Sequence, residues 1–298
     1  MNLKHTFVIL FSFSLLIFSS CLKKDDVVSP DTSTVENLTF QHNGLIREYI
    51  LYKPGNLPEN PSLVFVLHGY SGDANSVMHF YGMNDVADVN KFVVCYPLGT
   101  EDYVGYHHWN ARLTISSTDD IGFLTEIAEH LQTEYNLDTS RTFVCGHSNG
   151  GFMSYTLACE AQEVFKAIAS VAGTMSGYTW ENRDEASAVP VLQIHGVEDN
   201  YVPIDGSMPA GGGWGGAPAM DTIIDFWNNL NNCTTTNTVN ITANTSAYYH
   251  TGGVNGNEVW FYKINNFGHE WPGDTSIPGG DVSGIKASEV IWEFFSQY

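Results

Sequence analysis

Basic residues are scarce in this sequence of 298 residues. Lys and Arg together number 12, against 33 Asp and Glu, so the formal net charge is −21. A surface of this sign repels the phosphate backbone of nucleic acids, which excludes nucleic acid as a partner. A disordered chain is excluded as well, because hydrophobic residues make up 43% of the sequence and can form a large buried core.

Motifs of cofactor and metal chemistry are missing. The chain has neither a glycine-rich phosphate loop nor a dinucleotide fingerprint. His269-Glu270 lacks the second histidine of an H-E-x-x-H zinc site. His107 and His108 are adjacent, so on a strand their side chains point to opposite faces. The sequence therefore predicts no metal and no cofactor.

The N-terminal apolar run, residues 7–18, is too short to span a membrane and is typical of a secretory signal. Two serines precede Cys21, as in the lipobox of bacterial lipoproteins, although Phe18 replaces the usual leucine. The charge run at residues 23–26 resembles a surface-export tag, or is an ordinary solvated segment. We expect a signal peptide over residues 1–20 and an outer-membrane or cell-surface lipoprotein acylated at Cys21, with that anchor as its only membrane contact. A soluble secreted protein is the alternative.

The remaining cysteines are even in number, which permits disulfides in an oxidising compartment. Cys95 and Cys145 lie in apolar, strand-like runs, which suit small buried side chains equally well. The sequence leaves open any pairing among Cys95, Cys145, Cys159 and Cys233.

A polar tether is expected over residues 21–33 and a single domain over 34–298, because no repeat or linker interrupts the latter. The domain begins with a predicted hairpin, residues 36–52, which turns at Asn43-Gly44. Helical spacing appears at 119–135 and 285–295. Continuously apolar runs predict buried strands at residues 62–67, 92–96, 142–145, 167–172, 189–194 and 259–264.

This order of elements predicts an α/β fold. A mostly parallel central sheet should follow an N-terminal antiparallel hairpin and carry helices on both faces. The glycine-rich residues 210–216 are expected to form a loop insertion over one sheet edge rather than a domain boundary.

A strand, a sharp turn and a helix are predicted around Ser148. The run Gly146-His147-Ser148-Asn149-Gly150 separates the apolar residues 142–145 from a predicted helix at 152–159. In a G-x-S-x-G turn, glycines let backbones pass closely while the serine projects from the strand end as a nucleophile. Taken alone, the pattern also fits an ordinary loop between a strand and a helix.

A serine nucleophile needs a base and a carboxylate that orients the base. Asp199 and His269 each lie in a loop after a predicted strand, where open α/β sheets build their sites. The chain order Ser148, Asp199, His269 is that of α/β-hydrolases. We therefore predict these residues as the catalytic triad.

Alternatives remain for the base and the carboxylate. Glu198 could replace Asp199, because a neighbouring carboxylate is chemically competent. His195 and His250 compete with His269, although His195 better fits a buried, hydrogen-bonded role. His147 is expected to point away from the substrate face.

An oxyanion needs two backbone donors, which we assign to Asn149 and Tyr70, with Gly69 as the alternative to Tyr70. Aromatic residues in the expected site loops suggest a platform for a sugar or an aromatic ring, although each could instead pack in the core. As substrate-binding residues we predict Trp109, Trp214 and Trp271.

Several motifs between residues 40 and 296 resemble the secreted polyhydroxybutyrate depolymerase and feruloyl esterase family, which overlaps carbohydrate esterase family 1. The motifs are HGYSG at 68–72, WNA at 109–111, DDIGFL at 119–124, GHSNGGFMSYTLACE at 146–160, HGxxDxxVP at 195–203 and GHEWPG at 268–273. The resemblance implies an α/β-hydrolase fold and an acyl-serine intermediate. Residues 112–114 depart from the pattern, because many depolymerase-like members carry paired cysteines there.

Together with the predicted triad and export signal, the resemblance predicts a secreted serine carboxylic ester hydrolase, which we expect to be a monomer. Its expected substrates are feruloyl or acetyl esters on a polysaccharide. Polyhydroxybutyrate or another short-chain polyester is the alternative, which the lack of an appended polymer-binding domain weakens. Peptidase activity is a weaker alternative. A non-catalytic, glycan-binding surface lipoprotein is the alternative of another class.

Overall fold

The structure is a computed structural model that describes residues 32–298. The predicted signal, the tether up to residue 31 and Cys21 lie outside the described residues. The strands of the main sheet are β1 Thr34–His42, β2 Leu45–Lys53, β3 Leu63–Leu67, β4 Val93–Pro97, β7 Thr142–His147, β8 Ala167–Val171, β9 Val191–Gly196, β10 Thr235–Asn240, β11 Thr245–Thr251 and β12 Val259–Ile264. A separate two-stranded ribbon consists of β5 Thr100–Glu101 and β6 His107–His108.

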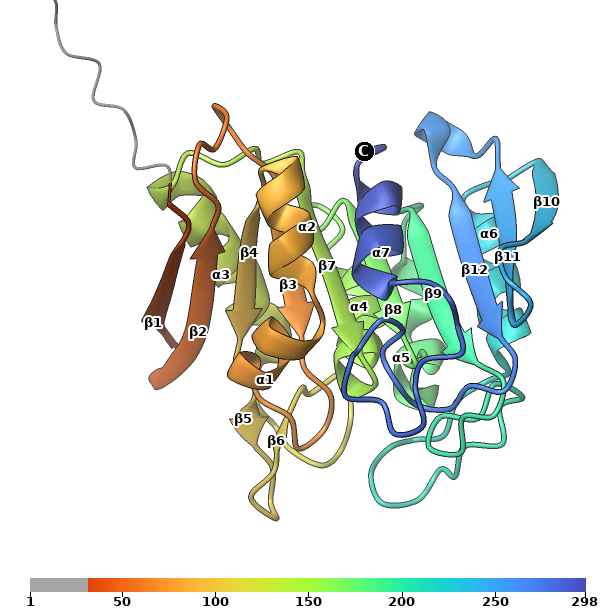
Figure 1. The fold of residues 1–298 in the computed structure, drawn as a ribbon. Coiled ribbons are helices and arrows are strands. Elements are labelled where there is room, and N and C mark those ends of the chain that lie inside the picture. Colours follow the sequence, from red (N-terminus) through yellow and green to blue (C-terminus); the bar gives the residue numbers. More distant parts are fainter. Residues whose placement is uncertain (1–31) are drawn as a thin grey trace, which may run out of the picture.

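The main sheet has the order β1-β2-β4-β3-β7-β8-β9-β12-β11-β10 (Figure 1). Its middle, from β4 to β12, is parallel. Both sides end in antiparallel strands, β2 and β1 on one side and β11 and β10 on the other. The predicted mostly parallel sheet with an N-terminal hairpin is confirmed. The hairpin turns at Asn43 and Gly44, which both have positive φ, as a tight two-residue turn requires.

Helices cover both faces of the sheet (Figure 1). The helices are α1 Ala74–Phe80, α2 Met83–Asn90, α3 Asp120–Glu134, α4 Asn149–Glu160, α5 Gly177–Glu181, α6 Met220–Leu230 and α7 Ala287–Phe295. One face of the sheet packs against α3, α4 and α6, and the other against α1, α2 and α7. The short helix α5 follows β8, and single 3₁₀ turns occupy Arg183–Glu185 and Val254–Gly256.

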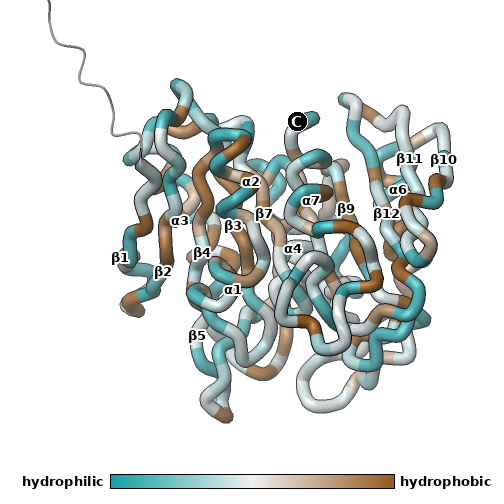
Figure 2. The backbone as a smooth tube through the Cα atoms, viewed as in Figure 1, coloured by the Kyte–Doolittle hydropathy of each residue, from teal (hydrophilic) through white to brown (hydrophobic). Residues whose placement is uncertain are grey.

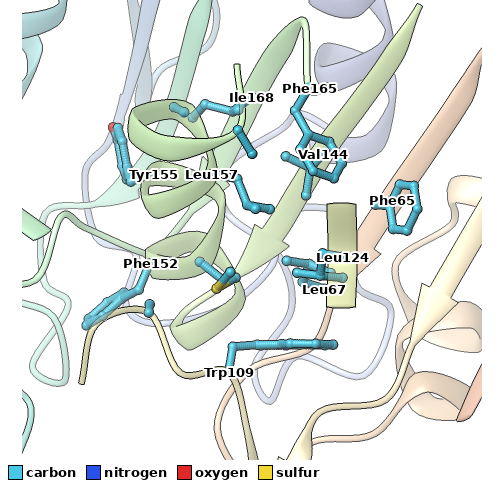
Figure 3. Close-up of a cluster of buried hydrophobic side chains, with 14 of the residues drawn as sticks. Phe65, Leu67, Trp109, Leu124, Val144, Phe152, Tyr155, Leu157, Phe165 and Ile168 are labelled. Atoms are coloured by element: carbon cyan, nitrogen blue, oxygen red, sulfur yellow. The ribbon is translucent and has the colours of Figure 1, made fainter. Parts of the chain in front are cut away.

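Apolar side chains fill the space between the sheet and its helices. β3 and β4 are buried along their whole length and are coloured as largely hydrophobic in Figure 2. On the α4 face, Phe65, Val144 and Ile168 come from three neighbouring strands and share a cluster with Leu157 of the helix (Figure 3). No helix within residues 32–298 combines the length and the apolar character needed to cross a membrane.

Some elements differ from the sequence expectations. The strand predicted at 142–145 continues to His147, and the helix predicted at 152–159 begins at Asn149. Helices α1, α2 and α6 and strands β10 and β11 were not expected. The cysteines at 95, 145, 159 and 233 are all free thiols.

Candidate active site

Ser148 occupies the turn between β7 and α4. Its backbone has φ 53° and ψ −118°, a conformation that a non-glycine residue adopts only under strain. The Ser148 amide donates to the Val171 carbonyl of β8 at 2.9 Å, which fixes the turn to the neighbouring strand. A Cβ on Gly150 would come within 2.4 Å of the Leu67 carbonyl oxygen, so the turn needs glycine there for packing.

His269 lies in the loop after β12 and contacts both Ser148 and Asp199, which lies in the loop after β9. Its Nε2 lies 2.8 Å from Ser148 Oγ, and its Nδ1 lies 2.7 Å from Asp199 Oδ2. Nδ1 therefore donates to the carboxylate, which leaves Nε2 to accept the serine proton. The structure thus brings together the three residues that the sequence singled out, in the arrangement that nucleophilic catalysis by serine requires.

Asp199 is buried, and both of its carboxylate oxygens accept hydrogen bonds. Its Oδ1 accepts the backbone amides of Tyr201 and Val202 at 2.9 and 2.8 Å. Burial acts to raise the pKa of Asp199, but the hydrogen bond and charge of His269, together with the Val202 amide, outweigh burial and hold this pKa below its ordinary value. The carboxylate is therefore ionised at neutral pH. Glu198, the alternative carboxylate, is exposed to solvent.

His195 and His250 have other partners than Ser148. His195 accepts from Gln193 Nε2 at its Nδ1 and donates from Nε2 to the Val202 carbonyl, both at 2.8 Å. Burial lowers its pKa, so it is a neutral, structural histidine 3.6 Å from Asp199 Oδ2. His250 lies on β11 and bonds Thr236 of the edge strand β10.

His147 directs its side chain into the protein. Its Nε2 lies 2.8 Å from the backbone carbonyl oxygen of His269, to which it donates. Burial, with a smaller effect of the neighbouring His269, lowers the pKa of His147 to about 3. The ring is therefore neutral at physiological pH and supports the backbone of the histidine that bonds Ser148.

The segment 68–72 lies beside Ser148. A Cβ on Gly69 would be 3.4 Å from Ser148 Cβ, so the neighbouring Tyr70 is close to the serine as well. Asn149, which directly follows Ser148, fixes the loop before α3. Its Oδ1 accepts the backbone amide of Trp109 at 2.6 Å, and its Nδ2 donates to the backbone carbonyl of Trp109 at 2.9 Å. The Tyr70 and Asn149 amides stay our predicted oxyanion donors.

A cavity of about 460 Å³ opens at Ser148 and His269. Its remaining lining residues are Tyr70, Ser71, Phe152, Tyr201, Val202, Met208, Pro209, Gly211 and Trp214. Trp214 contacts Tyr70 and Phe152 edge to face, with ring centroids 5.2 and 5.9 Å apart. The glycine-rich loop 210–216 therefore supplies a wall of this cavity.

The expectation that Trp109 and Trp271 contact substrate is wrong. Trp109 is fully buried in the same cluster as Leu124 (Figure 3), and its indole N–H donates to the His68 carbonyl at 3.0 Å. Trp271 is 2% exposed and stacks on Tyr81, with ring centroids 4.1 Å apart. Of the predicted tryptophans, Trp214 is the one that lines the cavity.

Sequence reasoning missed Phe152, Met208 and Tyr201 as cavity residues. Phe152 could have been found, because four residues after Ser148 it lies one helical turn along α4 on the same side. Tyr201 contacts the His269 ring at 5.1 Å between centroids and follows Asp199 by two residues. Met208 carries no comparable signal, since it belongs to a loop without periodicity.

Several known proteins with similar sequences are named as esterases. A probable feruloyl esterase C of Aspergillus niger is 28% identical over 211 residues, which are 67% of this chain and 72% of the relative. A bifunctional acetylxylan esterase/xylanase of Neocallimastix patriciarum is 30% identical over 170 residues, which are 56% of this chain but only 24% of the relative. The family model described as the prolyl oligopeptidase family matches residues 106–188, a part of the chain that includes Ser148 but neither Asp199 nor His269.

The fold is shared with esterases of known structure. An acetyl xylan esterase from Aspergillus awamori superposes with a TM-score of 0.62 at 16% identity, over 89% of this chain and all of that one. The chain has the α/β-hydrolase fold, as the sequence predicted. The resemblance to feruloyl esterases and carbohydrate esterases is confirmed.

Proposed function

We propose that this protein is a serine carboxylic ester hydrolase in which Ser148 is the nucleophile, His269 the general base and Asp199 the orienting carboxylate. One observation carries the proposal. The hydrogen bonds from Asp199 through His269 to Ser148 form an unbroken series that ends in an open cavity. The strained backbone at Ser148 supports it, because such strain persists where the surrounding structure enforces it for function.

In the proposed mechanism, His269 Nε2 takes the proton of Ser148 Oγ as this oxygen attacks the ester carbonyl carbon. The negative charge on the carbonyl oxygen is held by the Tyr70 and Asn149 amides. His269 then returns the proton to the leaving alcohol oxygen, which gives an acyl-serine. Water attacks this acyl group with the same base, releases the acid and restores Ser148. Asp199 stays ionised and stabilises the imidazolium at each stage.

Among esters, we propose a feruloyl ester carried by a polysaccharide as the substrate. The walls beside Ser148 are aromatic and apolar, and the Trp214 ring contacts both Tyr70 and Phe152 edge to face. Aromatic rings in this arrangement favour another aromatic ring between or beside them. An acetyl group would leave most of the 460 Å³ unfilled. The relatives named feruloyl esterase point to the same substrate class.

A substrate panel tests the proposal. We expect methyl ferulate to be cleaved with a higher kcat/KM than acetylated xylan or hydroxybutyrate oligomers, and Ser148→Ala to reduce each rate by several orders of magnitude. Ser296→Ala, on an exposed serine of the C-terminal segment, is the control and should retain full activity. Cleavage of none of the esters would contradict the hydrolase. A preference for acetyl or hydroxybutyryl esters would contradict the feruloyl substrate but not the ester hydrolase activity.

We also propose that the protein is exported and anchored through Cys21. The basis is the sequence pattern alone: a short apolar run followed by small residues and a cysteine. Fractionation of the producing cells tests it. The full chain should partition with membranes, and Cys21→Ala should move the protein to the soluble fraction. An unchanged distribution would contradict the anchor.

A further inference from the structure

The tip of the β5–β6 ribbon exposes apolar side chains to solvent. Tyr103 is 76% exposed, Val104 72% and Tyr106 52%. The ribbon projects beyond the edge of the sheet at which β3 and β7 end (Figure 1), and its tip carries a hydrophobic residue (Figure 2). Ser148 follows the end of β7, so the ribbon lies on the active-site side of the molecule.

The tip is held in one conformation by Asp102. Its Oδ1 accepts the backbone amides of Val104 and Tyr106 at 2.9 and 3.0 Å, and the Asp102 amide donates to the Tyr106 carbonyl at 2.9 Å. Gly105 closes the turn with φ 89°. The exposed rings are therefore presented by an ordered turn, whose backbone loses little conformational entropy when a ligand contacts them.

The same aspartate ties the tip to the cavity. Asp102 Oδ2 accepts the Tyr70 hydroxyl at 2.6 Å, and the Tyr106 ring contacts the Tyr70 ring at 5.6 Å between centroids. Tyr70 in turn contacts Trp214. Ring contacts thus lead from Trp214 in the cavity wall, through Tyr70, to Tyr106 of the ribbon.

Local charge restricts the ligand. Residues 92–111 contain no Lys or Arg, while Glu101 and Asp102 give the ribbon a negative charge. An anionic polymer would be repelled. Exposed tyrosine rings suit the apolar C–H faces of neutral sugar rings, and their hydroxyl groups can bond sugar hydroxyls.

We propose that the ribbon tip, residues 102–106, binds the neutral polysaccharide chain that carries the ester, outside the cavity that holds the acyl group. The inference rests on the proposed esterase function and adds a second subsite to it. The acyl group enters the cavity at Ser148, and sugars on the alcohol side of the ester lie along Tyr106 and Tyr103.

Two measurements on the full chain test the subsite. The first is binding of the Ser148→Ala protein to neutral arabinoxylan, with and without the additional pair Tyr103→Ser and Val104→Ser. The second is kcat/KM of the active protein on methyl ferulate, with and without the same pair. We expect the pair to weaken arabinoxylan binding about tenfold, as loss of an aromatic contact does, and to change methyl ferulate turnover less than twofold.

The matched control is the pair Phe80→Ser and Val89→Ser. These side chains are also exposed, on α1 and α2, and do not line the site cavity. The control pair should leave arabinoxylan binding unchanged, and polygalacturonate, an anionic polymer, should not bind.

Equal arabinoxylan binding by the Tyr103/Val104 variant and its parent, or no binding by the parent, would overturn the subsite. If the Tyr103/Val104 substitutions reduced arabinoxylan binding and kcat/KM on methyl ferulate by the same factor, the subsite would not be separate from the cavity. No turnover of methyl ferulate by the parent would contradict the esterase function instead, and arabinoxylan binding would still be measurable.

Discussion

The side chain of His147 donates a hydrogen bond to the backbone carbonyl of His269 over 2.8 Å. Ser148 directly follows His147 in the chain, and its hydroxyl lies 2.8 Å from Nε2 of the same His269. The turn between β7 and α4 therefore contacts His269 twice, once through the side chain of Ser148 and once through the side chain of His147. The second contact fixes where the imidazole of His269 lies, so His147 is a positioning residue.

Replacing His147 should lower turnover through misplacement of His269. We expect His147→Phe, which keeps a ring but loses the donor, to reduce kcat on methyl ferulate about a hundredfold with a small change in KM, since a shift of about 1 Å can have this effect. His147→Gln keeps a donor and should recover part of the rate. Equal kcat for the Phe and Gln variants would contradict a positioning role.

Asp199 should be needed for rate rather than for binding. In Asp199→Asn the amide no longer stabilises the imidazolium and favours the wrong tautomer of His269, so kcat should fall about 10⁴-fold while KM stays similar. The measurement is steady-state kinetics on methyl ferulate. Glu198→Gln, at the exposed neighbour, should retain the rate. A large loss in the Glu198 variant with a small one in Asp199→Asn would reverse the assignment of the carboxylate.

Buried neutral histidines should make the fold sensitive to mild acid. His68 accepts the Gly99 amide at Nε2 over 2.9 Å, and burial lowers its pKa to about 4. The unfolded chain binds a proton at this residue below about pH 6.5, while the folded chain does so only near pH 4. The contribution of His68 to the free energy of unfolding is therefore complete above pH 6.5 and declines between pH 6.5 and 4, by about 2 kcal/mol at pH 5.

Chemical denaturation at pH 7 and at pH 5 measures this loss. His147, with its pKa near 3, should add about 2 kcal/mol to the loss at pH 5. In His68→Gln the side-chain carbonyl can still accept the Gly99 amide, and the difference in unfolding free energy between the two pH values should shrink by about 2 kcal/mol. If the unfolding free energy of His68→Gln fell between pH 7 and pH 5 by as much as that of the parent, the acid sensitivity would not come from His68.

Trp214 should discriminate between acyl groups. Its ring contacts Tyr70 and Phe152 and forms a wall of the cavity beside Ser148. Trp214→Ala should raise KM for methyl ferulate about tenfold through the loss of an aromatic contact. KM for p-nitrophenyl acetate should change less than threefold, because an acetyl group is too short to need this wall. Parallel changes for both esters would argue against a feruloyl pocket.

The sequence predicted the central strands because they are buried on both faces and therefore read as continuous apolar runs. It could not show β10, whose residues are all exposed and, apart from Val239, polar, since a strand without an apolar face has no period to detect. α1 and α2 have seven and eight residues, too few for a helical period to stand out. α6 does carry helical spacing at Met220, Ile223 and Trp227, a signal that the preceding glycine-rich loop obscured.

Site residues were predictable where chain order constrained them. Ser148, Asp199 and His269 each follow a parallel strand, and such strands end at one edge of the sheet. Side-chain direction was not predictable, because beyond a strand end no period relates neighbouring residues. Trp109 and Trp271 therefore looked equivalent to Trp214 in sequence, although only Trp214 of these lines the cavity.

Covalent labelling of Ser148 tests the central claim most directly. An alkyl fluorophosphonate reacts with a serine hydroxyl only where a base and oxyanion donors activate it. The folded protein should acquire one label per chain, located by mass spectrometry on Ser148, and Ser148→Ala should acquire none. A folded protein that stays unlabelled, or that is labelled equally after Ser148→Ala, would contradict the proposed hydrolase.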